Sequence, residues 1–396
     1  MTDNTNSNVK IEIEENLEEN EKNKKILGFD RTKIKSLLMD ILIIVVMCLI
    51  GFLFGFILEK CKVYEPKFIR QQMIFNKFLM MKMFCSALAT SMLSILILNF
   101  IAKNRFLKVF ESYRDMLKPK SLLIVSAGGL ILGLGMTIAG SCPGMIFVQL
   151  GAGVNYSYLT LIGGLLAAFT HGLLNSYLTS TSKSDPIASK TIFEIVKINQ
   201  IIVRIVMILL LGVAIAVMEI VIPWKKDYKF RNETKPFFSV TSEVWHPILA
   251  GCLLGSLQFF SLLILSKSLG SSSSFSTVVS FVFPSKILEK FPYLKKFRFG
   301  LQNYISIIFV LSVFVGSMVS AFLGDVFNKA ENVHPYNALI GGFLLVFGAR
   351  LAGGCNTGHG ISGTSHLFFG SIVAMMSMFA SGIAIGFFAH TNEFFF

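Results

Sequence analysis

Nine apolar segments, each long enough to cross a bilayer, run through this chain of 396 residues. A transmembrane helix needs about 20 apolar residues, and the predicted spans are 37–58, 78–101, 121–141, 157–180, 199–222, 246–267, 302–323, 335–353 and 366–390. Charged residues make up only 15% of the chain, against about 25% in a soluble domain. A soluble enzyme or nucleic-acid-binding protein is therefore excluded, and we predict an all-α, polytopic helical membrane protein.

The spans group as four, a connecting one, and four more. Because an odd number of crossings precedes the second group, that group has the opposite orientation in the membrane. This predicts two inverted repeats. The expected division is a disordered polar tail (1–30), a first transmembrane repeat (36–180), a connector with one span and an outside loop (181–245) and a second transmembrane repeat (246–390).

A glycine motif ending on a cysteine occurs once in each group, 213 residues apart. The copies run from Gly128 to Cys142 and from Gly341 to Cys355, and both read G-G-x5-G-x3-A-G-x-C. Each copy ends an apolar segment, and the short apolar stretches 143–153 and 271–283 are too small to cross. The sequence therefore predicts broken or half helices near the midplane, with two thiols lining one narrow path from opposite sides.

Polar groups beside each thiol add to the predicted site. At the first break these are Gly140 and Ser141, followed by a new helix whose free amides would point back at Cys142. The second break offers Gly354, Asn356 and His359. Two potential ligands, Cys355 and His359, do not make a metal site, so neither a metal nor a cofactor is expected.

Three basic residues lie within the predicted spans. Lys82 and Arg204 lie near span ends, where long basic side chains usually reach back to the membrane surface. Arg350 has two interpretations, since it either reaches the surface in the same way or lends positive potential to an anion path.

The remaining small residues have a simpler interpretation. Cys48, Cys85 and Cys252 are expected to be packing residues. The pairs Gly51-x3-Gly55 and Gly251-x3-Gly255 are typical of close helix contacts.

At the two breaks the sequence resembles the YeeE/YedE family of sulfur-transport membrane proteins. The resemblance rests on GLGMTIAGSCPG (133–144) and GARLAGGCNTGHGISG (348–363), and it extends over most of residues 40–390, including GFLFGFILEKCKVYEP (51–66) and LGSSSSF (269–275). It implies thiosulfate uptake through an hourglass-shaped, two-repeat helical fold, in which cysteines pass the ion along by weak S–H···S contacts. Cys142 and Cys355 fall on two of those cysteines. A third family position aligns with Tyr64, three residues after Cys61, which is a candidate outer contact.

The expected function is transport, not catalysis, of a small sulfur-containing anion, first of all thiosulfate. A thiol is a weak donor and a soft, polarisable partner, which suits such a cargo. One alternative is another anion or sulfur species. Another is a membrane-embedded thiol sulfurtransferase or redox protein, for which His359 and Arg350 are the candidate activators beside Cys355. Expected partners are the anion, the lipid bilayer and an unidentified cytoplasmic sulfur-handling enzyme, with no nucleic acid.

Basic residues predict the orientation. With the N-terminus in the cytoplasm, the inside segments hold 22 Lys and Arg and the outside segments hold 11. This asymmetry favours a cytoplasmic N-terminus, and the plasma membrane is the favoured location.

Overall fold

The computed structural model describes residues 33–35, 37–180, 185–228, 239–265 and 270–392. The chain divides into two units at Val46. Met1–Val46 contributes the helical start of the first span, and Met47–Phe396 is one compact unit that contains everything discussed below. The predicted polar tail 1–30 lies outside the described residues.

The described residues form an all-α membrane protein with nine helices long and apolar enough to span a bilayer. The first span is Lys33–Lys60, whose residue 36 is outside the description. The other long helices are α3 (Leu79–Ile101), α5 (Leu122–Ala139), α7 (Ser157–Ser180), α9 (Gln200–Val221), α11 (Pro247–Phe260) continued by the π-helical η1 (Ser261–Leu265), α15 (Leu301–Leu323), α16 (Pro335–Ala352) and α17 (Phe369–Thr391). All nine predicted spans are thus confirmed as helices of suitable length.

Shorter helices connect or interrupt the spans. They are α2 (Pro66–Met73), α4 (Lys103–Leu117), α6 (Met145–Gly151), α8 (Ile192–Val196), α10 (Trp224–Asp227), α12 (Ser272–Val282), α13 (Ser285–Leu288), α14 (Pro292–Arg298) and the π-helical η2 (Asn356–Gly363). The two short apolar stretches predicted as half helices appear as α6 and α12. Helix α6 packs on α15 and α7, and α12 packs on α15, α14 and α7, so protein surrounds α6 and the buried start of α12.

The helices that carry the duplicated motif, α5 and α16, pack directly on each other. A Cβ on Gly128 would lie 2.4 Å from the backbone nitrogen of Ala352, and a Cβ on Gly341 would lie 2.5 Å from that of Ala139. These two contacts are the same contact in the two copies of the motif. Only glycine permits such an approach, and it lets the end of each helix pack against the first half of its partner.

The glycine pairs outside the motif also make reciprocal contacts. Gly55 on the first span lies against the backbone of Val313 on α15, and Gly251 on α11 lies against Ser86 and Met83 on α3. A Cβ at either position would fall within 2.4 Å of its neighbour, which confirms the predicted close packing. The first helix of each group therefore packs on the second helix of the other group.

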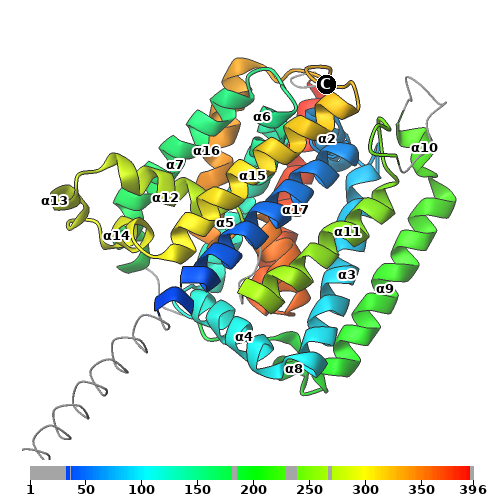
Figure 1. Ribbon diagram of the computed structural model, residues 1–396. Helices are drawn as coiled ribbons and strands as arrows, with labels where there is room; N and C mark the ends of the chain where they lie inside the picture. The colour runs from blue at the N-terminus through cyan, green and yellow to red at the C-terminus, as the bar shows by residue number, and fades with distance from the viewer. Residues whose placement is uncertain (1–32, 36, 181–184, 229–238, 266–269, 393–396) are drawn as a thin grey trace, which may run out of the picture. The chain divides into compact units, whose positions relative to one another are not determined.

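Figure 1 shows how the remaining elements surround these pairs. Helix α9 runs along one edge beside α3, and it presents many exposed apolar side chains. Helices α4 and α8 lie at one end of the long helices, whereas α2 and α10 lie at the other. Helices α4 and α8, which lie in two of the segments with predicted inside charges, therefore share one end.

Candidate functional site

The first break follows Ala139, where α5 ends. Gly140 adopts a left-handed conformation with φ of 58°, and a Cβ there would lie 2.5 Å from Pro66 Cβ, so only glycine fits. The buried Ser141 comes next, and the carbonyl of Cys142 accepts a hydrogen bond from Ile146 N at 3.1 Å. Helix α6 begins there, and its first amides, on Gly144 and Met145, face Cys142 Sγ, as the sequence predicted.

The second break follows Ala352, where α16 ends. Gly353 has φ of 94°, again the left-handed region that favours glycine. Cys355 then caps η2, and its carbonyl accepts from His359 N at 2.7 Å. Three amides face Cys355 Sγ, one from Gly358 in η2 and two from Ser271 and Ser272 at the start of α12.

The two breaks meet at Ser271. Its hydroxyl lies 3.7 Å from Cys355 Sγ, and it lies 3.2 Å from the place a Cβ on Gly144 would occupy. The same Gly144 position lies 3.5 Å from Thr357 Oγ1. Cys142 and Cys355 are 5% and 2% exposed, so neither thiol faces lipid. The fold therefore brings the two cysteines of the duplicated motif into one buried region.

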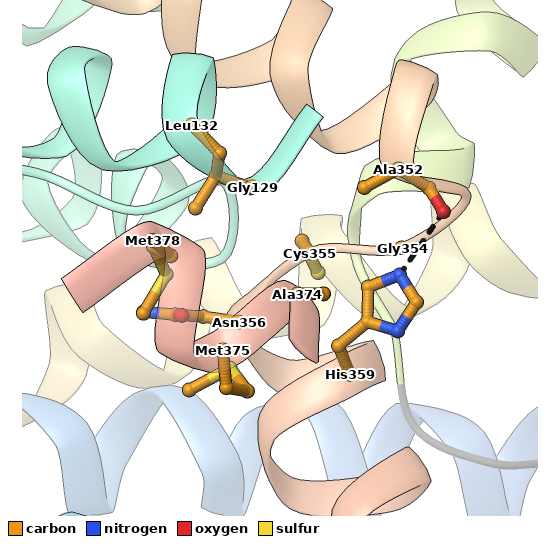
Figure 2. A pocket seen from close by; sticks show the side chains of 10 residues that line it. All are labelled: Gly129, Leu132, Ala352, Gly354, Cys355, Asn356, His359, Ala374, Met375 and Met378. Carbon is orange, nitrogen blue, oxygen red and sulfur yellow. Dashed lines mark hydrogen bonds between the residues drawn. The ribbon is translucent and has the colours of Figure 1, made fainter. Parts of the chain in front are cut away.

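Two small cavities extend from this region, and Asn356 lines both of them. The larger, of about 40 Å³, has Cys142 in its wall among Phe54, Leu58, Met80, Met83, Phe84, Met145, Leu254 and Thr357. The smaller, of about 10 Å³, contains Cys355, Gly354 and His359 together with Met375 and Met378, as Figure 2 shows. A cavity of this size holds at most one water molecule, so the space beside Cys355 is the tighter of the two.

The lining is rich in sulfur beyond the two cysteines. Asn356 Nδ2 donates to Met136 Sδ at 3.3 Å, and five further methionines, Met80, Met83, Met145, Met375 and Met378, line the cavities. Thioethers are polarisable and adapt their shape. Sequence reasoning missed these residues, since nothing in their spacing distinguishes them from the other methionines of the chain.

His359 holds the second break in shape. Its Nε2 lies 3.3 Å from the carbonyl of Ala352 and its Nδ1 lies 3.0 Å from Ser371 Oγ. The carbonyl can only accept, so Nε2 carries the proton and Nδ1 accepts from Ser371. Figure 2 shows the ring turned toward Ala352. A histidine held this way ties the end of α16 to η2 and α17.

Arg350 lies one turn before the break and points away from the cavities. Its guanidinium donates to Tyr293 Oη and lies 5.0 Å from the Phe297 ring centre, both on α14. Lys120, which sequence reasoning did not select, lies closer to the break and donates to the Leu351 carbonyl at 3.0 Å. Burial, and next the charge of Arg350, lower the pKa of Lys120 to about 8.

Cys61 is fully buried but is absent from the walls of both cavities. It follows the first span, and Tyr64, the aligned family position, lies nearer the first break. Gln149 Nε2 bridges the two, since it donates to the Tyr64 and Gly140 carbonyls at 2.8 Å each. The Gln149 side chain therefore links the backbone of this segment to the backbone of the first break. The Cys61 thiol itself does not line either cavity.

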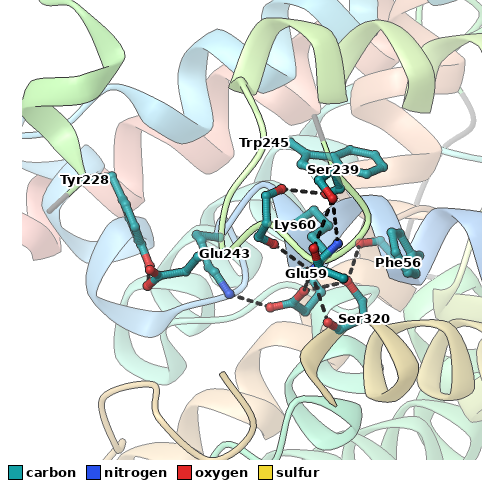
Figure 3. A network of polar contacts seen from close by, with 11 residues as sticks. Phe56, Glu59, Lys60, Tyr228, Ser239, Glu243, Trp245 and Ser320 are labelled. Carbon is teal, nitrogen blue, oxygen red and sulfur yellow. Dashed lines mark hydrogen bonds and ion pairs between the residues drawn. The ribbon is translucent and has the colours of Figure 1, made fainter. Parts of the chain in front are cut away.

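A buried ion cluster surrounds Cys61. Glu59 pairs with Lys62 at 2.5 Å and accepts from Ser320 Oγ at 2.6 Å, while Lys60 Nζ donates to the carbonyls of Ser242 and Ser320. Figure 3 shows Glu59 and Lys60 meeting Ser320 in this network. Sequence reasoning placed these charges in an outside loop. The sequence did contain a signal for this cluster, because the opposite charges of Glu59 and Lys60 directly follow the first apolar span.

The prediction that the Lys82 and Arg204 side chains reach back to the membrane surface is wrong. Lys82 is fully buried and pairs with Glu219 Oε2 at 2.7 Å. Arg204 is also fully buried, and its guanidinium lies 5.3 Å from the Phe106 ring centre. Lys82 reaches from α3 to Glu219 near the end of α9, whereas Arg204, near the start of α9, lies over Phe106 of α4.

Comparison with known proteins gives a family match and several transporter relatives. A family model described as sulphur transport matches residues 61–385. The thiosulfate transporter TsuA of Spirochaeta thermophila is 23% identical over 82% of this chain and 93% of its own length, and TsuA of Escherichia coli K12 is 24% identical over 63% and 70%. A probable transporter of Xylella fastidiosa is 28% identical over 144 residues, which are 36% of this chain and 93% of that protein. That match has about the length of one predicted repeat.

Proposed function

The chain belongs to the sulphur transport family of membrane proteins, and from this premise we propose that it carries thiosulfate across the membrane between the thiols of Cys142 and Cys355. The observation that supports this most is the meeting of the two breaks at Ser271, next to Cys355 Sγ and Gly144. The named thiosulfate transporters among its relatives point to the same cargo.

The chemistry of the breaks suits an ion with one soft and one hard end. The thiols and the methionine side chains are polarisable partners for the terminal sulfur. The amides that face the two cysteines are donors for the anion oxygens. Each such contact is weak, and the absence of a permanent positive charge in the two cavity walls lets the ion leave again.

The positions of the possible activators favour passage over sulfur transfer. A thiol that attacks a substrate needs a nearby base or cation to form the thiolate. His359 is bonded to Ala352 and Ser371, and Arg350 to Tyr293. Both side chains are therefore engaged in holding helix ends, so neither is placed to act as the base or cation beside Cys355.

The two groups of helices act as inverted repeats in this proposal. The support is the pairwise symmetry of their contacts, in which Gly128 meets Ala352 and Gly341 meets Ala139. Residues 36–180 and 246–390 are the two repeats, joined by the connector 181–245. The thiol in each repeat then approaches the midplane from its own side of the membrane.

Uptake by the purified chain in liposomes tests the function. Vesicles with the full chain should accumulate ³⁵S-labelled thiosulfate faster than protein-free vesicles. Unlabelled thiosulfate and a selenium analogue should compete, and sulfate should compete weakly because it offers no soft atom. Uptake no faster than in protein-free vesicles would overturn the proposal. Competition by sulfide or sulfite alone would assign a different cargo to the same path.

A further inference from the structure

Arg204 is buried in an apolar part of the fold without a partner for its charge. Its side chain is fully buried, and none of its three guanidinium nitrogens has a hydrogen-bond partner among the described residues. Arginine stays protonated in proteins, and an uncompensated buried charge is strongly unfavourable. The Phe106 ring, 5.3 Å away, compensates only a part of this.

His366 is a second unpartnered group at the same place. It is fully buried, and both ring nitrogens lack partners among the described residues. Its ring stacks on Phe106 with centroids 6.1 Å apart, and it interacts electrostatically with Arg204. Buried polar groups nearly always have a partner. Five unpartnered nitrogens on two side chains that share one aromatic neighbour therefore point to a missing ligand.

The acidic side chains on the neighbouring short helices are occupied elsewhere. Glu111 of α4 and Glu194 of α8 both pair with Arg114, at 3.6 and 2.5 Å. Neither carboxylate is left to neutralise Arg204, so the missing partner is not one of these two acidic side chains.

We propose that Arg204 and His366 bind a small oxyanion at a site separate from the two cysteines. The guanidinium supplies a planar set of donors that matches two oxygens of a tetrahedral anion, and the imidazole N–H supplies one more donor. The complete enclosure of both side chains restricts the ligand to a small inorganic ion. Thiosulfate, sulfate and phosphate share this chemistry.

The site lies one aromatic ring away from the second break. Tyr113 donates to the Gly358 carbonyl at 3.0 Å beside His359, and its ring stacks on His366 at 6.1 Å. It also lies beside α4 and α8, at the end with the predicted inside charges.

Anion-dependent thermal stability of the purified full chain tests the site. The protein is dialysed into chloride buffer in a detergent without phosphate, and phosphate, sulfate or thiosulfate is then titrated at constant ionic strength. The wild type should show a saturable rise in Tm with an oxyanion that chloride does not give. Arg204→Leu should lose the rise, and Arg204→Lys, which keeps the charge but not the planar donors, should raise the apparent Kd at least about tenfold.

Arg105→Leu is the matched control, because it makes the same change one residue from Phe106 at an exposed position, and it should keep the rise. His366→Phe gives a second test if Arg204→Leu does not fold, and it should weaken binding while preserving the ring stack. No oxyanion-specific rise in the wild type, or an equal rise in Arg204→Leu, would overturn the proposal. The ion that gives the lowest Kd identifies the source, thiosulfate as cargo or phosphate as a resident cytoplasmic anion.

The oxyanion site and the transport path can be tested independently of each other. The double variant Cys142→Ser, Cys355→Ser should lose uptake and keep the oxyanion-dependent rise in Tm. Loss of that rise in the double variant would assign the effect to the thiols and not to Arg204.

Discussion

At the scale of single residues, each central cysteine stands two positions after a left-handed glycine. Gly140 precedes Cys142 and Gly353 precedes Cys355, with φ of 58° and 94°. Another residue type at either glycine would be strained, so the chain turns at a fixed place and the thiol follows it. The position of each thiol is thus determined by local backbone geometry more than by its own contacts.

In the proposed path, Gly144 is the residue whose missing side chain leaves space beside Ser271 and Thr357. In Gly144→Ala the new Cβ would lie 3.2 Å from Ser271 Oγ and 3.5 Å from Thr357 Oγ1. The backbone there is helical, so alanine is not strained. We expect thiosulfate uptake in vesicles to fall about tenfold, a barrier increase of roughly 1.4 kcal/mol, with unchanged thermal stability. Gly270→Ala, with open space around its Cβ, should transport normally. Wild-type uptake by Gly144→Ala would contradict the position of the path.

The residue patterns singled out Cys142 and Cys355 at the two helix breaks, but they did not specify all of the neighbouring side chains. Cys142 and Cys355 were identified because a spacing of 213 residues repeats a glycine pattern with a known backbone meaning. Cys61 was selected by alignment alone, and the structure leaves it outside both cavities. The aromatic neighbours of Arg350 and Arg204 come from α14 and α4, far away in sequence, and no local pattern specifies such contacts.

At the scale of helices, the α5–α16 contact sets where the breaks lie. Gly128, Gly135, Gly341 and Gly348 each bring the backbone of one helix within van der Waals distance of the other. Since each helix crosses its partner near the middle, the end of one is held against the start of the other. The periodicity of these glycines was visible in the sequence, but which helix they face was not.

A methyl group at this contact should separate the two helices. In Gly128→Ala the Cβ would lie 2.4 Å from Ala352 N and 2.8 Å from its Cα, and backbone atoms cannot move aside as a side chain can. We expect a loss of about 1–3 kcal/mol in stability, measured as a lower Tm in detergent, together with reduced uptake. Gly212→Ala on the lipid-facing α9 has nothing within 4 Å of the new Cβ and should leave both unchanged. Equal Tm values for the two variants would argue against the contact.

At the scale of the whole molecule, the apolar segments predicted the membrane class and all nine spans because length and composition alone decide whether a helix can cross. The ion cluster of Glu59, Lys60 and Lys62 could not be predicted in the same way. Its partners Ser242 and Ser320 come from distant segments, and composition marks such residues only as polar.

The orientation predicted from the distribution of basic residues can be measured by labelling. Asp115 lies on α4, at the end with the predicted inside charges, and Asp325 follows α15 at an exposed position. In intact cells, a membrane-impermeant maleimide should label Asp325→Cys and should label Asp115→Cys only after permeabilisation. Both variants make the same substitution at an exposed site, so each controls for the other. The reverse pattern would place the N-terminus outside.

The most direct measurement of the central claim is thiosulfate uptake by Cys142→Ser and Cys355→Ser in vesicles. Serine keeps a small donor but removes the polarisable sulfur, and Cys252→Ser, on α11 and absent from both cavity walls, is the control for the same change. If soft contacts carry the ion, uptake should fall at least about a hundredfold, roughly 2.7 kcal/mol, in both central variants and stay normal in the control. Wild-type uptake by both central variants, at equal protein content, would contradict the account.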